Sequence, residues 1–181
     1  MLTEFLRDQL FGTAWLALMA GGWFGWAQED PKPRLRGLWG AGSVLGLLLA
    51  AAFGILVWRN WATDTALDGR YWVFGAIVAG EALLIGGGCL LLARQERIRW
   101  YGWWIGLCVA VHFVALAWVF SDWSYLLLAA VQVVGLLALR PILARGEYAT
   151  SRWASPWIAA TFLCYAVISA VIVLARNGYP Y

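Results

Sequence analysis

The sequence predicts an all-α bundle of about six transmembrane spans, and composition and the pattern of apolar runs are the two observations that predict it. Apolar residues make up 63% of the 181 residues, and charged residues make up 13%. A soluble domain is about 45–50% apolar and about 25% charged, so this composition is typical of a membrane protein. The links between the apolar runs are too short for a soluble domain. Residues 1–181 are therefore expected to form a single integral membrane domain.

Each apolar run is close to the ~20 residues that cross a ~30 Å hydrocarbon layer. The expected spans cover residues 9–27, 38–58, 71–93, 101–120, 123–143 and 155–175. The first run is expected to be a retained helix and not a signal peptide, because Glu4, Arg7 and Asp8 precede it in place of a basic segment. Two prolines interrupt the link before the second span. Pro156 suits the first turn of the last helix.

The distribution of Arg and Lys predicts the orientation of the spans. The links that join spans one to two, three to four and five to six, with their flanks, carry nine positive residues, and the remaining segments carry four. Because positive residues accumulate on the cytoplasmic side, both termini are expected outside the cytoplasm of a bacterial plasma membrane.

Composition also bears on the classes of function. The net charge of +3 is scattered along the links, without a basic stripe that would predict a nucleic-acid partner. Three cysteines lie singly in apolar runs, and the chain has one histidine, so neither a metal site nor a cofactor is expected. No pattern supplies a nucleophile with its own base, so no catalytic residue is assigned and an enzyme is the least favoured class.

Three polar side chains are expected at one depth inside the spans. Glu81 follows Trp72 by nine residues, His112 precedes Phe120 by eight, and Gln132 follows Trp123 by nine. At ~1.5 Å per residue, each lies roughly 12–14 Å from the same membrane face. An ionisable group at this depth is costly and marks a site by default. Short links make these spans antiparallel neighbours, so a Glu–His–Gln cluster is expected.

Three roles are open for this cluster. It could be a structural clasp in which each group satisfies another where water is absent. It could be a proton-responsive site that binds a ligand, with Glu81 as the responsive group, His112 as its partner and Gln132 as a neutral donor. It could also perform acid–base catalysis, although no nucleophile or metal accompanies it.

Two other features have a structural and a functional interpretation. Glu29 and Asp30, with Arg34 and Arg36, form a patch after the first span that is either a solvated turn or a site for a cation or a basic partner. The tryptophans crowd the span boundaries, as in an aromatic belt, but Trp15 lies deep in the first span and suits an aromatic-lined cleft better. Glycines inside the second and third spans are expected to be helix-packing faces.

Several short segments carry a resemblance to a known family. They are Gly25 to Pro31 (Gly-Trp-Ala-Gln-Glu-Asp-Pro), Leu38 to Gly46, Trp58 to Trp61, Val78 to Glu81, and Gly106 to Phe120 around Val111-His-Phe113. With these the chain resembles small, uncharacterised bacterial membrane proteins of about six helices. The resemblance implies a six-helix fold and no established activity. Where the family continues the His-Phe pair with a proline, this chain has Val114-Ala115-Leu116.

The sequence thus favours a membrane protein that binds or moves a small or lipid-like molecule through a cleft that reaches the polar layer. The alternative is an accessory or structural subunit that packs its glycine-rich and tryptophan-rich faces against a larger complex. Expected partners are membrane lipid, a small-molecule ligand, and a membrane-protein partner or a second copy of the chain.

Overall fold

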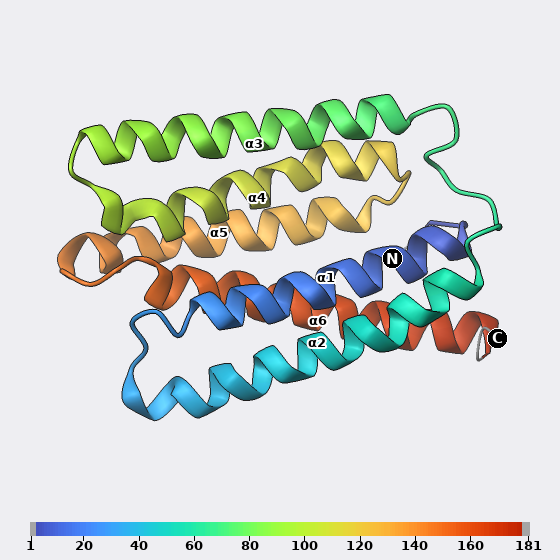
Figure 1. Ribbon diagram of the computed structural model, residues 1–181, viewed down its shortest axis with the longest axis horizontal. Helices are drawn as coiled ribbons and strands as arrows, with labels where there is room; N and C mark the ends of the chain where they lie inside the picture. The colour runs from blue at the N-terminus through green and yellow to red at the C-terminus, as the bar shows by residue number, and fades with distance from the viewer. Residues whose placement is uncertain (1–2, 179–181) are drawn as a thin grey trace.

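The computed structural model describes residues 3–178, and its regular structure is helical throughout (Figure 1). The helices are α1 (Leu6–Trp26), α2 (Arg36–Arg59), α3 (Tyr71–Arg94), α4 (Tyr101–Val119), α5 (Ser124–Arg145) and α6 (Ser151–Asn177). One turn of 3-10 helix precedes α2 (Pro33–Leu35) and another precedes α4 (Ile98–Trp100). The six expected spans therefore correspond to six helices, and most ends agree within about three residues.

Five of these helices, α2 to α6, are long and apolar enough to cross a membrane. The fold is accordingly an all-helical bundle of the polytopic membrane class. α1 is the exception among the expected spans, because tryptophan, glycine and threonine residues make it less apolar than the others. It is nevertheless 21 residues long, and about half of these residues are buried.

α1 lies at the centre of the bundle. It packs along α2 on one side and along α6 on the other, and α6 in turn contacts α4 and α5. α4 packs between α3 and α5, as the short links predict. α3 and α2 form opposite edges of the bundle (Figure 1), and α3 packs chiefly on α4. Both termini lie at the same end.

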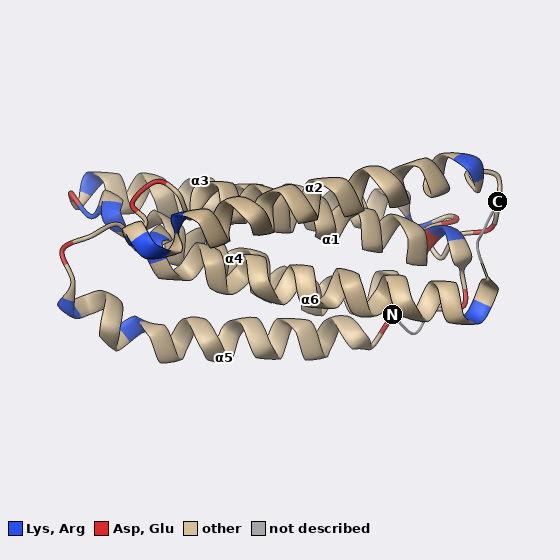
Figure 2. Ribbon diagram, turned by 90° about the horizontal axis from the view of Figure 1, so that it is seen from below, with Lys and Arg blue, Asp and Glu red and all other residues tan. Residues whose placement is uncertain are grey.

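Charged residues gather at the two ends of the bundle and leave a long apolar middle (Figure 2). The links that join α1 to α2, α3 to α4 and α5 to α6 lie together at the end opposite the start of α1 and the end of α6 (Figure 1), and these links and their flanks contain Lys32, Arg97, Arg99 and Arg152; we call this the arginine-rich end. This separation is the pattern that a hydrocarbon layer around the middle of the helices would require.

Close packing of α1 on α2 depends on glycine. A Cβ atom at Gly46 would lie 2.7 Å from the Ala17 carbonyl oxygen and 2.8 Å from the Gly21 nitrogen. A Cβ atom at Gly42 would lie 2.8 Å from the Phe24 ring. The expected glycine packing face is therefore present in α2. Gly40 of α2 and Gly75, Gly80, Gly86 and Gly87 of α3 do not pack on another helix of the described chain, because an added Cβ would meet nothing within 4 Å, so for these glycines the packing face stays a prediction.

The start of α6 is a second correction. The helix begins at Ser151, four residues before the expected 155, so Pro156 lies within its second turn and not its first. Contacts from distant segments hold the additional turn: the Ser151 hydroxyl donates to Glu29, and Arg152 pairs with Asp30. The local sequence pattern contains no sign of these contacts.

Candidate functional site

The structure brings Glu81 of α3 and His112 of α4 into contact. Glu81 Oε1 lies 3.2 Å from His112 Nδ1, and the same Nδ1 lies 2.9 Å from the Val109 carbonyl oxygen. Because two acceptors converge on Nδ1, this nitrogen is expected to carry a proton in either charge state of the ring. Within residues 3–178, the other carboxylate oxygen and the other ring nitrogen have no hydrogen-bond partner. Both remain available to a bound molecule.

A cavity of about 380 Å³ lies beside this pair, and we call it the central pocket. α1 and α3 form its walls and α4 its floor. Aromatic rings from five helices line it: Trp15 and Trp23 of α1, Phe74 of α3, Phe113 of α4, Tyr125 of α5 and Phe162 of α6. Edge-to-face contacts fix several of these rings, with centroids 5.5 Å apart for Phe113 and Phe162.

The central pocket opens to the side of the bundle. Trp15 and Phe11 on α1 and Val78 on α3 line it and are also exposed at the surface. The sequence placed Trp15 in an aromatic-lined cleft as one of two interpretations, and the residue lies in the wall of this pocket. A molecule dissolved in the surrounding apolar phase would meet the mouth between α1 and α3.

A smaller cavity of about 160 Å³ adjoins the central pocket toward the end that holds both termini. The two cavities share Phe11, Phe74 and Phe120. Residues 60–70, which link α2 to α3, cover it. Two residues of α1 hold this link.

Arg7 donates to the Trp61 carbonyl oxygen at 2.6 Å and to the Tyr71 hydroxyl at 3.2 Å. The buried Asp8 carboxylate accepts from the Thr65 hydroxyl at 2.6 Å and from the Ala66 N–H at 2.7 Å. These bonds connect the link directly to α1. No sequence pattern singles out Arg7 and Asp8 as anchors of this link, because their partners are more than fifty residues away.

Gln132 occupies a different place from the expected one. Its side chain is fully buried, and its amide nitrogen donates to the Thr161 hydroxyl of α6 at 2.9 Å. Its carbonyl oxygen, Oε1, is buried without a hydrogen-bond partner among the described residues. Gln132 does not line the central pocket. The expected layer of three groups is thus a Glu–His pair plus a separate contact between α5 and α6.

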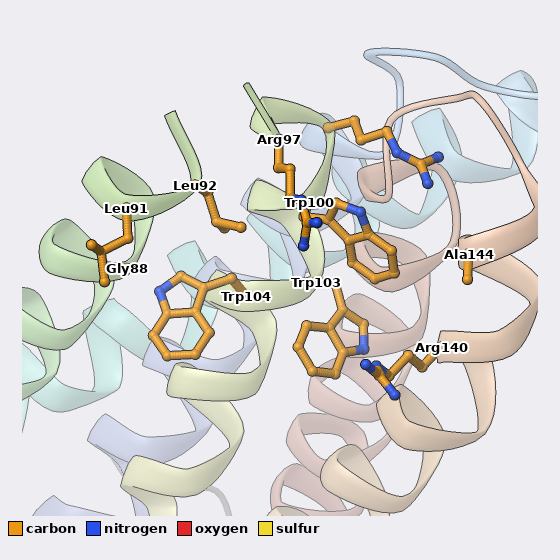
Figure 3. A pocket seen from close by; sticks show the side chains of 10 residues that line it. Gly88, Leu91, Leu92, Arg97, Trp100, Trp103, Trp104, Arg140 and Ala144 are labelled. Carbon is orange, nitrogen blue, oxygen red and sulfur yellow. The ribbon is translucent and has the colours of Figure 1, made fainter. Parts of the chain in front are cut away.

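A larger cavity of about 590 Å³ lies at the arginine-rich end (Figure 3). Its lining contains Arg97, Arg99 and Arg140, together with Trp100, Trp103 and Trp104; we call it the arginine pocket. In the sequence, these arginines indicate orientation and these tryptophans indicate an aromatic belt. No sequence pattern shows that the two sets meet, because Arg140 belongs to α5, whereas the other two arginines and the tryptophans lie near the start of α4.

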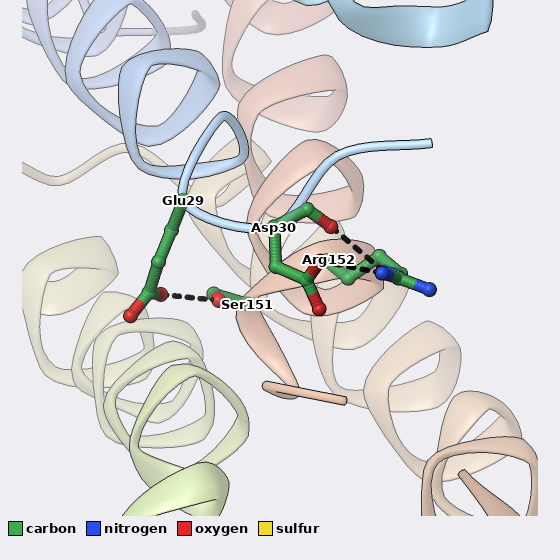
Figure 4. Close-up of polar contacts among 4 residues, drawn as sticks. All are labelled: Glu29, Asp30, Ser151 and Arg152. Carbon is green, nitrogen blue, oxygen red and sulfur yellow. Dashed lines mark hydrogen bonds and ion pairs between the residues drawn. The ribbon is translucent and has the colours of Figure 1, made fainter. Parts of the chain in front are cut away.

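The acidic patch after α1 reaches α6 (Figure 4). Glu29 accepts hydrogen bonds from the Ser151 hydroxyl at 2.6 Å and from the Trp26 ring at 2.9 Å. The Asp30 carboxylate pairs with Arg152 at 2.5 Å, and its carbonyl oxygen accepts from the same guanidinium at 2.7 Å. Within the described part of the chain, neither acid forms a hydrogen bond or ion pair with Arg34 or Arg36, and both arginines are exposed. These acids join the link to α6.

The contacts just described define the chemistry that is present. Within residues 3–178, no group of three or more His, Cys, Asp or Glu side chains lies together as metal ligands would. Comparison with known proteins finds no matching family model, no matching curated protein and no matching solved structure. The class defined by fold and site is therefore a helical, membrane-type protein with one acid–base pair beside an aromatic cavity, and the resemblance to the small bacterial family stays a prediction.

Proposed function

We propose that this protein binds, and by opening at the α1–α3 side moves, a small and largely apolar molecule that carries a cationic or hydrogen-bonding group. The apolar part would lie against the aromatic rings of the central pocket, and the polar group would contact Glu81 and His112. We place the protein in a bacterial plasma membrane with both termini outside the cytoplasm, as the Arg and Lys distribution predicts.

The observation that carries this proposal is the cavity beside the Glu81–His112 pair. A clasp that only joins α3 to α4 needs no open space next to it. Here the pair borders about 380 Å³ of cavity, and a carboxylate oxygen and a ring nitrogen have no partner within the described chain. Apolar pockets of about 300–1,000 Å³ with a few convergent polar groups are typical of small-molecule sites.

The residues also limit the ligand's chemistry. Glu81 is the only carboxylate in the lining, and arginine and lysine are absent from it, so an anionic ligand has no partner. Trp15, Trp23 and the phenylalanines offer ring faces, which attract cations as well as apolar groups. An amine on an aromatic or short aliphatic body therefore fits best.

Phenethylamine and 2-phenylethanol provide the test, because they share a body and differ in the charge of the head group. In detergent-solubilised protein, saturation-transfer NMR should show tighter binding of the amine. Glu81→Gln should remove about a tenfold preference for the amine, in line with the roughly 1.5–3 kcal/mol of a hydrogen bond to a charged group.

Glu96→Gln is the matched control, because Glu96 is an exposed carboxylate just beyond α3 and outside the pocket. It should leave the preference unchanged. Equal binding of amine and alcohol by the unaltered protein, or an equal preference in Glu81→Gln, contradicts the proposal.

One observation favours the accessory-subunit alternative. None of the 24 residues of α3 is buried, and its glycines at 75, 80, 86 and 87 face open space. A partner helix could approach closely there. Gly80→Leu with Gly87→Leu should then abolish co-purification of a partner while leaving amine binding intact, and no effect on any co-purifying protein would exclude this role.

A further inference from the structure

The arginine pocket lies at the opposite end of the bundle from the link of residues 60–70, and its chemistry differs from that of the central pocket. It is bounded by the last turns of α3, the start of α4 and the C-terminal half of α5. Its ten lining residues include three arginines, three tryptophans and two leucines, and no acidic residue. The lining therefore combines positive charge with a large apolar surface.

The aromatic walls of this pocket are fixed by contacts with neighbouring helices. The Trp103 ring nitrogen donates to the Leu136 carbonyl oxygen of α5 at 2.8 Å. The Trp104 ring lies directly over Gly88 of α3, where any Cβ atom would clash with it, and its nitrogen lies 3.3 Å from the Leu84 carbonyl oxygen. The cavity is thus an open groove whose aromatic side chains are held in place and cannot simply rotate to fill it.

Two of the arginines that line the cavity, Arg97 and Arg140, have no hydrogen-bond or ion-pair partner for their guanidinium groups within residues 3–178. The two ion pairs among the described residues involve Glu81 with His112 and Asp30 with Arg152, and neither includes an arginine of this pocket. Arg99 is different, because it donates to the Gly146 carbonyl oxygen and lies over the Trp100 ring. Arg97 and Arg140 approach the space beside Trp103 from different elements (Figure 3).

The position of Arg140 along α5 also favours a bound anion. α5 continues to Arg145, so Arg140 lies more than one turn before the helix end, toward the apolar middle of the bundle. A guanidinium held there is stabilised when an anion accompanies it. The N-terminus of the 19-residue α4 also points its partial positive charge toward this region.

We propose that the arginine pocket binds the phosphate head group of an anionic phospholipid, held by Arg97 and Arg140. The fork of donors on each guanidinium matches phosphate oxygens. Trp103, Trp104, Leu91 and Leu92 contact the glycerol and the upper acyl chain. Basic pockets between membrane helices on the cytoplasmic side, where anionic lipids are abundant, recognise such head groups.

The lining favours a lipid over a free phosphate ion. The apolar part of the pocket, with Leu91, Leu92 and Ala144 beside the tryptophans, would remain uncovered by a bare ion. The cavity of about 590 Å³ also exceeds what one phosphate fills. A phosphate attached to acyl chains satisfies the charged and the apolar walls together.

The test compares three probes on detergent-solubilised protein: dioleoylphosphatidylglycerol, dioleoylphosphatidylcholine and inorganic phosphate. Phosphatidylglycerol should raise the thermal unfolding midpoint more than phosphatidylcholine, and inorganic phosphate should have little effect. Arg97→Gln and Arg140→Gln should each weaken the apparent affinity for phosphatidylglycerol about fivefold, since each arginine near a membrane surface is worth about 1 kcal/mol.

Arg94→Gln and Arg145→Gln serve as matched controls, because both residues end helices at the same end of the bundle and neither lines the pocket. They should keep the affinity of the unaltered protein. An equal loss in all four variants shows general attraction to charge and overturns the proposal. Equal protection by both lipids overturns it, and so does full protection by inorganic phosphate. Arg97→Gln alters an exposed link residue, so the test stands even if Arg140→Gln does not fold.

Discussion

α1 and α3 form the two walls of the central pocket, yet they are held in the bundle by different means. α1 packs between α2 and α6, and its buried Thr13 hydroxyl shares a hydrogen bond of 2.6 Å with Ser169 of α6. The Ser43 hydroxyl of α2 donates to the Gly21 carbonyl oxygen of α1 at 2.8 Å. α3 has no buried residue and packs chiefly on α4.

The few polar contacts that α3 makes involve groups near the pockets. They are the Glu81–His112 pair, the Trp104 bond to the Leu84 carbonyl oxygen and the Arg7 bond to the Tyr71 hydroxyl. One wall of the pocket therefore belongs to the core, and the other packs at the edge of the bundle with few polar contacts, one of which is the Glu81–His112 pair that the proposed ligand would contact. Regions with few buried contacts open at low free-energy cost, so we expect α3 to be the wall that moves.

The largest expected effect concerns the packing of α1. Gly46→Leu places side-chain atoms where backbone atoms of Ala17 and Gly21 already lie, within 3 Å of the new Cβ. We expect it to lower the free energy of unfolding by about 3 kcal/mol, the upper part of the overpacking range. Unfolding in mixed detergent–SDS micelles measures this change.

The controls for Gly46→Leu are Gly54→Leu in α2 and Gly87→Leu in α3, where an added Cβ meets nothing within 4 Å. Both should stay within about 0.5 kcal/mol of the unaltered protein, as surface substitutions do. A large loss in Gly87→Leu would show that α3 is packed as tightly as α1, and the comparison would fail.

A smaller effect is expected at the pair that attaches α3. His112→Ala leaves the Glu81 carboxylate without its partner in an apolar setting, which should cost about 1–2 kcal/mol. Glu81→Gln should cost less, because an amide oxygen can still accept from His112 Nδ1. If both variants unfold like the unaltered protein, the pair does not attach α3 to α4.

Removing one attachment of the link of residues 60–70 to α1 should loosen that link. Arg7→Gln removes donors to the Trp61 carbonyl oxygen and the Tyr71 hydroxyl and a guanidinium 5.3 Å from the centroid of the Trp61 ring. Because Arg7 is half-buried and its hydrogen bonds are exposed to solvent, we expect at most about 1 kcal/mol of global destabilisation. Hydrogen exchange in the link should increase severalfold, whereas Arg59→Gln, at the end of α2, should leave it unchanged.

The smallest expected effect is a pH dependence of folding stability that arises from Asp8, which precedes the expected first span. Burial raises the pKa of this carboxyl above its usual 3.8, against the opposing hydrogen bonds from Thr65 and Ala66 and the charge of Arg7. The folded protein then binds more protons at this group than the unfolded chain does, from pH 3.8 up to the raised pKa. Its contribution to stability is greatest below pH 3.8 and falls as the pH rises through this window.

Asp8→Asn should remove this contribution to the pH dependence of the unfolding free energy. The difference in unfolding free energy between the variant and the unaltered protein should therefore change with pH only between pH 3.8 and the raised pKa. A difference that is constant over the window shows that Asp8 has the same pKa in both states.

The sequence by itself determined the helices. Runs of about twenty apolar residues between charge clusters leave the backbone no other way to satisfy its hydrogen bonds in an apolar phase. It also predicted that Glu81 and His112 would come together, because equal depth on two antiparallel neighbours is enough when both face the shared interface.

Tertiary structure decided which way each side chain points around its helix axis. Gln132 faces Thr161 of α6 and not the Glu81–His112 pair, and an expected depth along a helix axis contains no information on that rotation. The same reason separates Gly42 and Gly46 of α2, which meet α1, from Gly54 of α2 and most glycines of α3, which meet nothing within 4 Å. The arginine pocket depends on how the side chains of α3, α4 and α5 are turned toward one another, so only the packed bundle could show that tryptophans and arginines counted separately along the chain meet around one cavity.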